Sequence, residues 1–459
     1  ITTEKWHDID ETFITRTDLD GISVLECHDF QSEASTIALI LRETLETSQK
    51  TASLITADRS LARRVKSELK RWDINIDDSA GTPITETPLL VFWRLIGKMV
   101  QDGLAPVSFL AAMKHPLARG GMFAGALRRN TRLLEQLILR GPRPATGVDG
   151  LIRALETSIG VVAENFGGSV VTDKEKKDLY NWIIDLSEPI RDLERLMRCP
   201  LVKVQDIFEK HNRLVETLLL DGSKNSSWNP YSTDYREQIA SIFSDIFEMC
   251  YDFPEISGQE YLPFLESLLS SATYRAPFGA HPRLSILGPL EGRLMHFDRV
   301  ILGGLNEGSW PPEPQADPWM SRPMRSDIGL PLPEIRIGQS AHDFVQLCGA
   351  KEVFLTRSKR INGTPTVVSR WLLRMSSLIE SLDYGGVLDE ANANWISWQN
   401  SLDTPNCTRR LSPPTPRPVL AQRPRSFSVT QIGAWLRNPY HIYARQILKL
   451  VPLGVLDAE

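Results

Sequence analysis

Residues 52–69 read A-S-L-I-T-A-D-R-S-L-A-R-R-V-K-S-E-L, and this stretch indicates the fold class. Its start is mostly apolar and includes β-branched Ile55 and Thr56, which favours a short buried strand that ends before Asp58. After Asp58, apolar residues recur at positions 61, 62, 65 and 69, the spacing of an amphipathic helix. A strand followed directly by a helix is the repeating unit of a parallel α/β sheet.

The same alternation occurs before this stretch and again far after it. A strand is predicted at 22–25 and a helix at 32–45, and strands return at 283–287, 299–302 and 352–356. Between about residues 90 and 271 the pattern is instead that of long amphipathic helices. We therefore predict one α/β domain, made of two pieces, with a large helical insertion between them.

Five segments follow from these patterns. The α/β pieces are expected at 1–95 and 276–380, and the helical insertion at 96–275. A linker is expected at 381–425, because its second half is rich in Pro and Arg. Ser428 is a helix N-cap candidate, so a further domain is expected to start within 426–459.

The bulk composition is that of a globular protein. The 459 residues are 42% apolar and 24% charged, with no apolar run of membrane-spanning length and no secretory signal at the start. We expect a cytoplasmic protein that contacts no membrane. Because the chain begins at Ile1 instead of Met and stops without a terminating element, we also expect a fragment.

The distribution of charge and the spacing of the cysteines indicate a local basic segment and reduced thiols. The net charge is −5, yet the segment from Thr404 to Arg425 contains five arginines and no acid (Arg409, Arg410, Arg417, Arg423 and Arg425). The five cysteines show no C-x-x-C spacing, which predicts reduced thiols and neither a zinc site nor a disulfide framework.

Catalytic motifs are absent from the sequence. There is no G-x-x-x-x-G-K-[ST] phosphate loop, so we expect no ATP hydrolysis by this chain alone. The Gly303–Gly308 segment lacks the lysine and predicts a tight turn after a strand. The charged stretch 173–177 predicts a solvated face, and His211, on the apolar stripe of residues 207–219, predicts a core histidine.

A proline-stiffened loop after the predicted strand 299–302 carries two tryptophans and a cation, Trp310, Trp319 and Arg322. Indole faces next to cations are typical of single-stranded nucleic-acid binding. The alternative, which the residues by themselves favour, is that both tryptophans pack the loop onto its own domain.

Residues 284–293, L-S-I-L-G-P-L-E-G-R, and 297–312, F-D-R-V-I-L-G-G-L-N-E-G-S-W-P-P, closely resemble AddB proteins of the alphaproteobacterial type. These proteins are the B subunits of AddAB helicase–nucleases. Segments 56–65, 78–83, 114–117 and 365–372 agree in the same order, so the resemblance covers nearly the whole chain and is weakest in the helical middle.

The resemblance implies a fold and a set of site residues. The two α/β pieces look like the second RecA-like domain of a superfamily 1 helicase, a domain of the P-loop NTPase kind, interrupted by a helical subdomain. By the same resemblance Arg357 corresponds to the arginine of helicase motif VI, which contacts a nucleotide. The candidate contacts to single-stranded DNA are Arg293, Trp310, Trp319, Arg322, Arg325 and Arg360.

The resemblance also implies partners and cofactors. In the family AddB pairs with AddA, and the complex uses ATP and Mg²⁺ to process double-stranded DNA ends for recombinational repair. A PD-(D/E)XK nuclease site would lie beyond Glu459, and residues 428–450 resemble the first helix of that domain. Asn438 stands where many relatives have a cysteine ligand, so no iron–sulfur cluster is expected, and no cofactor is expected within this chain.

Two alternatives stay open. The chain could be a non-catalytic module that docks on AddA, or a helicase with a nucleotide site of its own. Salt-sensitive DNA affinity separates the first from a DNA-binding role, because phosphate contacts weaken steeply with salt.

Overall fold

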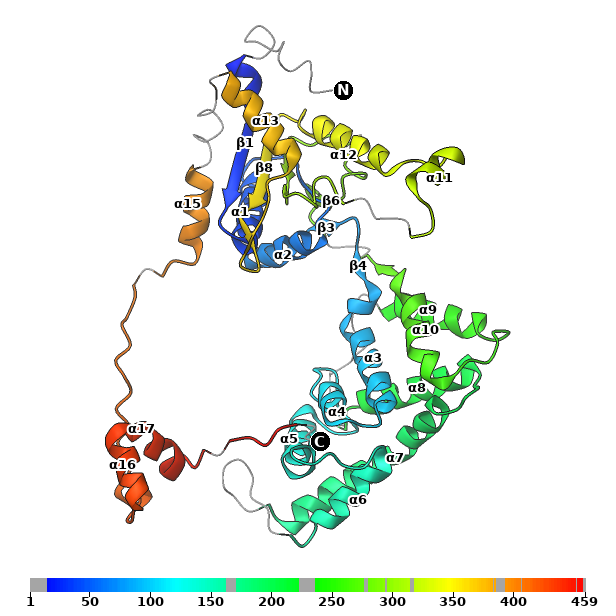
Figure 1. The fold of residues 1–459 in the computed structure, drawn as a ribbon, viewed down its shortest axis with the longest axis vertical. Coiled ribbons are helices and arrows are strands. Elements are labelled where there is room, and N and C mark those ends of the chain that lie inside the picture. The colour runs from blue at the N-terminus through cyan, green and yellow to red at the C-terminus, as the bar shows by residue number, and fades with distance from the viewer. Residues whose placement is uncertain are drawn as a thin grey trace. The chain divides into compact units, whose positions relative to one another are not determined.

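A computed structural model describes residues 15–161, 171–222, 236–275, 280–293, 295–313, 318–382, 384, 393–405, 407–450 and 452–456. The chain divides into two compact units, one made of 1–81 and 275–410 and the other of 82–274 and 411–459 (Figure 1). The ends of the expected segments, 1–14 and 457–459, lie outside the described residues.

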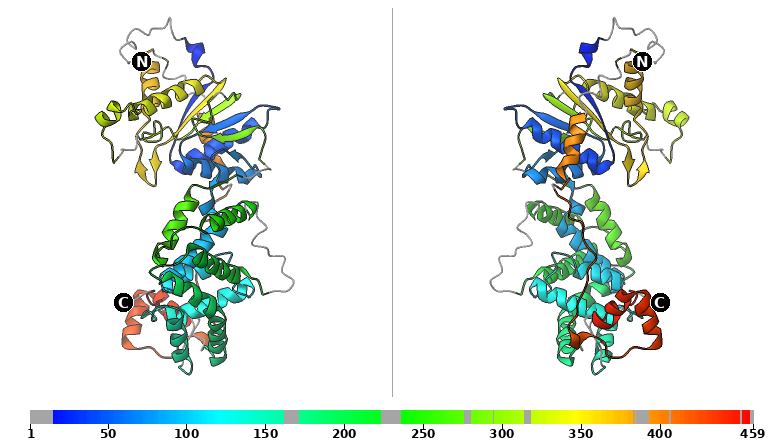
Figure 2. Two further views of the ribbon diagram at one scale, coloured as in Figure 1. Left: turned by 90° about the vertical axis from the view of Figure 1, so that its right-hand side faces the viewer. Right: turned by 90° about the vertical axis from the view of Figure 1, so that its left-hand side faces the viewer.

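The first unit is an α/β domain, as the sequence predicts. Among the described residues, six strands form one sheet in the order β1-β8-β7-β2-β6-β3, and every neighbouring pair is parallel. The strands are β1 (Ile22–Cys27), β2 (Ala52–Ile55), β3 (Asp77–Asp78), β6 (Leu284–Leu287), β7 (Arg299–Leu302) and β8 (Glu352–Ser358). Strand β2 lies between β6 and β7, so two pieces distant in sequence share one sheet (Figure 2).

Helices cover both faces of this sheet because successive strand side chains point to opposite sides. Leu54 belongs to the core formed with α1 (Phe30–Thr44) and α2 (Arg59–Leu69). Its neighbour Ile55 belongs to the core formed with α12 (Pro333–Leu347) and α13 (Arg370–Ser381). The smaller elements of the unit are η2 (Arg16–Leu19), η3 (Lys70–Trp72), α11 (Arg322–Asp327) and the hairpin β9 (Arg360–Ile361) with β10 (Thr364–Pro365).

Helix α15 (Ala393–Leu402) lies within the segment expected to be a linker. Trp395 and Ile396 of this helix pack against the α1 side of the sheet core, and Trp395 meets Phe354 edge to face at 5.7 Å between ring centroids. The expected linker therefore contributes one helix to the α/β unit.

The second unit is built of helices around one apolar core. Its helices are α3 (Pro88–Gln101), α4 (Pro106–Met113), α5 (Ala124–Leu134), α6 (Val148–Ser158), α7 (Asp173–Met197), α8 (Val204–Leu219), α9 (Arg236–Met249) and α10 (Tyr261–Ser270), with short turns η4 (Ile84–Glu86), η5 (Glu135–Leu139) and η6 (Gly258–Glu260). Two short antiparallel strands, β4 (Thr82–Pro83) and β5 (Thr273–Tyr274), join where the chain enters and leaves it. The unit begins at Thr82, so the expected boundary at residue 95 lies inside α3.

His211 is a core residue, as predicted. Its side chain is fully buried on α8. Its Nδ1 lies 3.0 Å from the Tyr261 hydroxyl, and its Nε2 lies 2.9 Å from the Trp93 carbonyl oxygen. Because a carbonyl only accepts, Nε2 carries the proton and Nδ1 accepts from Tyr261. Burial lowers the pKa of His211 to about 3, so the ring is neutral at pH 7.

The charged stretch 173–177 is only partly solvated, which corrects the expectation of a solvated face. Thr172 and Glu175 form a capping box at the start of α7, and Lys176 is 1% exposed. The Lys176 ammonium donates to the carbonyls of Ser158, at 2.9 Å, and Val161. The stretch therefore starts a helix and ties it to the end of α6.

The C-terminal part of the second unit comprises η7 (Leu420–Gln422), α16 (Val429–Arg437), α17 (Pro439–Ile442) and η8 (Tyr443–Ile447). Ser428 caps α16 as predicted, through a capping box with Gln431. Asn438 caps α17 by accepting from the His441 amide at 3.3 Å.

Candidate functional site

The candidate site lies at the carboxyl edge of the parallel sheet. The connection from β2 through α2 to β3 runs in one direction along the sheet, and the connection from β7 through α12 to β8 runs in the other. Strands β2 and β7 are neighbours, so their carboxyl ends form a topological switch point. In open α/β sheets ligands bind outside the strand ends at such points.

A buried glutamate lies beneath this switch point. Glu33, in the first turn of α1, is fully buried, and its Oε1 accepts from the Gly304 amide and the Thr356 hydroxyl, both at 2.8 Å. Its Oε2 has no hydrogen-bond partner among the described residues. Burial raises the pKa of Glu33, since desolvation disfavours the carboxylate.

Gly304 supplies the left-handed backbone at which the loop after β7 turns. It has φ +76°, a conformation that favours glycine. The predicted turn after β7 is therefore present, and it brings a backbone amide onto the Glu33 carboxylate.

Arg357, the expected nucleotide contact, is engaged within its own domain. Its side chain is 6% exposed, and Nη1 pairs with Glu26 Oε1 at 2.6 Å. The other nitrogens donate to Asn306 Oδ1 at 3.2 Å and to the Thr366 hydroxyl at 3.1 Å. Burial alone would raise the pKa of Glu26, but Lys359 and Arg357 outweigh it and lower that pKa. The arginine thus joins β1, β8 and the loop after β7.

The loop after β7 and the segment after β10 are joined by hydrogen bonds and an ion pair at this edge. The Leu305 amide donates to the Thr356 carbonyl at 2.9 Å, and the Ser369 amide donates to the Leu305 carbonyl at 3.0 Å. Arg370 pairs with Glu307, its Nε lying 2.9 Å from Oε1. Hydrogen bonding to Arg370 lowers the pKa of Glu307.

Trp310 is removed from the candidates for base stacking. It is fully buried, its Nε1 donates to the Gly303 carbonyl at 3.2 Å, and its ring meets Phe344 edge to face. Neither face of its indole reaches solvent. The alternative that the loop tryptophans pack against their own domain is therefore correct for Trp310.

Arg293 is paired with the helix behind the site. Its Nε and Nη2 lie 2.5 and 3.0 Å from the carboxylate oxygens of Asp343 on α12. Glu291, in the same loop, accepts from the Ser79 hydroxyl and from the Gly288 amide at 2.8 Å. The hydrogen bond from Ser79 is the main reason that the pKa of Glu291 is lowered.

Among the remaining candidates, Trp319, Arg322 and Arg360 are exposed and Arg325 is half-buried. Trp319 is 85% exposed, Arg322 pairs with Glu334 on the surface, and Arg325 donates to the Pro331 carbonyl at 3.1 Å. Arg360 is exposed on β9 and forms no ion pair with a described residue. Arg360 follows strand β8, which lies between β1 and β7, whereas the other three belong to the α11 region.

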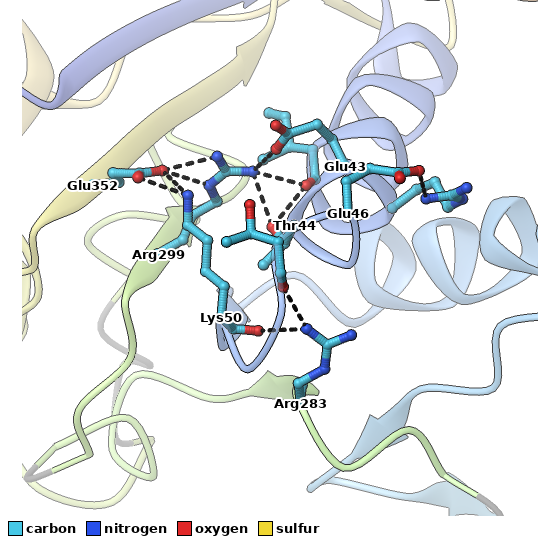
Figure 3. Close-up of polar contacts among 10 residues, drawn as sticks. Glu43, Thr44, Glu46, Lys50, Arg283, Arg299 and Glu352 are labelled. Atoms are coloured by element: carbon cyan, nitrogen blue, oxygen red, sulfur yellow. Dashed lines mark hydrogen bonds and ion pairs between the residues drawn. The ribbon is translucent and has the colours of Figure 1, made fainter.

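The opposite, amino edge of the sheet holds an ionic network around Arg299 (Figure 3). The Arg299 side chain is 6% exposed and bonds Glu43 at 2.5 Å, Glu352 at 2.8 Å and the Thr44 hydroxyl at 2.9 Å. Lys50 also pairs with Glu352, at 2.6 Å. This network joins the end of α1 to β7 and β8 through paired charges, so its role is to stabilise the sheet.

Sequence reasoning missed Glu33 and Arg299. Glu33 precedes Ile37 and Leu41 at intervals of four, so an acid on an apolar helical stripe was the available signal.

Among the described residues no group of three or more His, Cys, Asp or Glu side chains could hold a metal ion. No described helix is long and apolar enough to span a membrane.

The fold defines an α/β protein with a mostly helical second unit, and comparison with known proteins adds relatives without a described activity. No family model matches the chain. An uncharacterized protein of Rickettsia bellii (strain RML369-C) is 26% identical over 203 residues, which are 42% of this chain and 23% of that protein. One of Rickettsia felis (strain ATCC VR-1525 / URRWXCal2) is 25% identical over 203 residues, 43% of this chain and 22% of that protein. The chain thus matches less than a quarter of the length of these relatives.

Proposed function

We propose that this chain is the helicase-like part of an AddB-type subunit, which acts with AddA in an ATP-dependent helicase–exonuclease that processes double-strand breaks. In this proposal the α/β unit corresponds to a RecA-like domain of superfamily 1, the helical unit is its insertion, and residues 426–459 begin the nuclease domain. The chain itself guides single-stranded DNA and performs no catalysis.

One observation carries the proposal. The residues that follow β6 and β7 in the two closely resembling segments, 288–293 and 303–312, lie at the carboxyl edge of one parallel sheet together with the further resembling segment 365–372, and α/β proteins bind ligands at this edge. Hydrogen bonds between Leu305 and Ser369 and between Glu307 and Val367 join two of these segments directly. The relatives' greater length is compatible with a larger subunit.

The proposed DNA surface has two parts, Trp319, Arg322 and Arg325 in and before α11, and Arg360 on β9. An exposed indole supplies a stacking face, and the arginines supply charge for the phosphates. Arg357 is not part of this surface, because its guanidinium is buried and bonded to Glu26 and Asn306.

The test is fluorescence anisotropy with a labelled single-stranded oligonucleotide at low and moderate salt. We expect Trp319→Ala and Arg360→Ala to weaken binding, and Arg360→Ala to reduce the salt dependence as well. Arg42→Gln is the control, because Arg42 belongs to α1 and pairs with Glu46 at the helix end. Unchanged affinity in both variants would remove this surface from the proposal.

A second function, docking on AddA without DNA contact, is favoured by a different feature of the same region. Trp319, Met324, Ile328 and Ile335 are all more than half exposed, which is a high density of apolar side chains for a solvated surface. Under this alternative Ile328→Asp abolishes capture by AddA, while DNA affinity is absent or insensitive to salt.

A further inference from the structure

The C-terminal part of the chain has a charge opposite to the rest. From Thr404 to Leu456 there is no Asp or Glu, but there are eight Lys and Arg residues: Arg409, Arg410, Arg417, Arg423, Arg425, Arg437, Arg445 and Lys449. Since the whole chain carries −5, the remaining residues carry −13. Fifty-three residues without an acid form a strongly basic segment in an acidic protein.

A groove lined by rings lies within this segment. Its volume is about 560 Å³, and Pro414, Pro416 and Pro418 line it together with Phe427, Trp435, Tyr440 and Tyr443. The Phe427 and Trp435 rings are stacked, with centroids 5.6 Å apart and planes 10° from parallel. Trp435 is 49% exposed and Tyr440 is 63% exposed, so ring surface remains open to a ligand.

Local sequence explains why the groove forms. The prolines at 414, 416 and 418 prevent a helix and keep that wall extended. Arg423 links the end of this extended segment to the turn that follows it, because its Nε donates to the Pro418 carbonyl at 3.0 Å. The caps Ser428 and Asn438 start two short helices in succession, and these carry the ring-bearing wall.

Five cations of this basic segment have no ion-pair partner among the described residues. Arg417, Arg425, Arg437, Arg445 and Lys449 form no ion pair with any described residue. Cations that the fold leaves unpaired beside open ring faces favour an anionic ligand that also carries flat groups.

We propose that this groove is a second binding site for single-stranded nucleic acid, separate from the carboxyl edge of the sheet. Bases stack on Trp435 and Tyr440, which line the groove. The backbone phosphates contact Arg417 and Arg425, which adjoin the lining residues Pro416, Pro418 and Pro424 in sequence. An acidic peptide or an anionic membrane matches the charge but makes no use of the ring faces. The choice of DNA over RNA rests on the proposed function.

The experiment measures anisotropy of a labelled 20-nucleotide oligothymidylate with the full chain across a salt series. A matched probe has the same sugar–phosphate backbone without bases. Tyr440→Ala is expected to weaken oligothymidylate binding roughly 5- to 150-fold, the effect of losing one stacked base, and to leave the abasic probe unchanged. Tyr251→Ala is the matched control, because Tyr251 is 75% exposed in the same unit and lies outside the groove.

Replacing Arg417 and Arg425 with Gln is expected to weaken both probes and to reduce the salt slope by about 1.4, since each lost phosphate contact removes about 0.7. Equal affinity for both probes, or equal effects of Tyr440→Ala on both, would overturn the stacking site and leave a charge-only surface. Tight binding to phosphatidylserine vesicles without oligothymidylate binding would overturn it in favour of a membrane.

The same titrations separate this inference from the proposed function. Weakening by Trp319→Ala and Arg360→Ala without weakening by Tyr440→Ala would refute the groove alone. Weakening by Tyr440→Ala alone would refute the DNA surface proposed at Trp319 and Arg360 and retain the groove. No binding of either probe to the wild-type chain refutes both.

Discussion

Arg299 shows how one residue holds several elements together. It begins β7, yet its guanidinium reaches the last turn of α1 and the first residue of β8. An arginine at the start of the apolar strand R-V-I-L suits this place because a fork of five N–H donors can satisfy several acceptors at once. The residue therefore closes the amino edge of the sheet.

We expect Arg299→Met to lower the free energy of unfolding by about 2 kcal/mol. This is less than a fully buried ion pair costs to break, because Glu43 and Glu352 still reach water. Urea denaturation followed by circular dichroism measures it. Arg42→Gln, which breaks the exposed pair with Glu46, should cost ~0.5 kcal/mol or less. Equal losses in the two variants would contradict the structural role of Arg299.

Glu33 at the carboxyl edge has a buried carboxylate oxygen, Oε2, with no hydrogen-bond partner among the described residues. Its pKa is raised in the folded chain, so the folded state keeps a proton that the unfolded state loses above about pH 4.5. Its contribution to stability is present below that pH and is lost as the pH rises through the folded pKa.

Glu33→Gln should therefore change how stability depends on pH. A glutamine keeps an oxygen for the Gly304 amide and the Thr356 hydroxyl but has no proton to lose. We expect the variant to gain stability relative to wild type as the pH rises from 4.5 to 8. Urea midpoints across this range are the measurement, and parallel wild-type and variant curves would contradict a raised pKa.

At the scale of elements, the helical unit is organised by a polar group inside its apolar core. Trp93 of α3, His211 of α8 and Tyr261 of α10 form a chain of hydrogen bonds, and the Trp93 and His211 rings lie 3.9 Å apart. Gly97 on α3 makes this approach possible, since a Cβ there would lie 2.8 Å from a carbon of the His211 ring. The network sets the register between three helices.

This network makes the stability of the helical unit sensitive to acid. The pKa of His211 is about 3 when folded and about 6.5 when unfolded, so between these values the unfolded chain binds a proton that the folded chain rejects. The stability it contributes is complete above pH 6.5 and is lost as the pH falls toward 3. We expect His211→Gln to be less stable at pH 7 and to have a shallower loss between pH 6.5 and 4. A slope equal to wild type would show that other groups cause the acid loss.

At the scale of the whole molecule, the chain leaves the α/β unit after Gly81 and returns at Arg275. Strand β2 pairs with β6 across this excursion, with Ala52 opposite Leu284. The sheet therefore requires contacts between residues that are far apart in sequence. Each unit has its own apolar core.

We expect the full chain to unfold in two transitions, because separate cores need not melt together. Arg299→Met should move only the transition of the α/β unit, and His211→Gln only that of the helical unit. Hydrogen exchange with peptide resolution assigns each transition to its residues. One transition that both variants shift equally would mean that the units unfold as a single cooperative body.

The sequence by itself determined the α/β class, the positions of the buried strands, the helical interruption and the buried state of His211. These features depend on local periodicity, which is legible in residues such as 52–69 and 207–219. It also identified the strand-to-loop turn at Gly303–Gly308, whose glycines have local conformational demands.

Only the tertiary structure decided which candidate side chains are open and which are engaged. Trp310 and Trp319 look alike in sequence, yet one is fully buried and the other is 85% exposed. Arg357 and Arg360 are three residues apart, yet only Arg357 meets Glu26 and Asn306. Burial and pairing arise from residues distant in the chain, and no local pattern contains them. For the same reason the unpartnered oxygen of Glu33 and the ring-lined groove became visible only in the folded molecule.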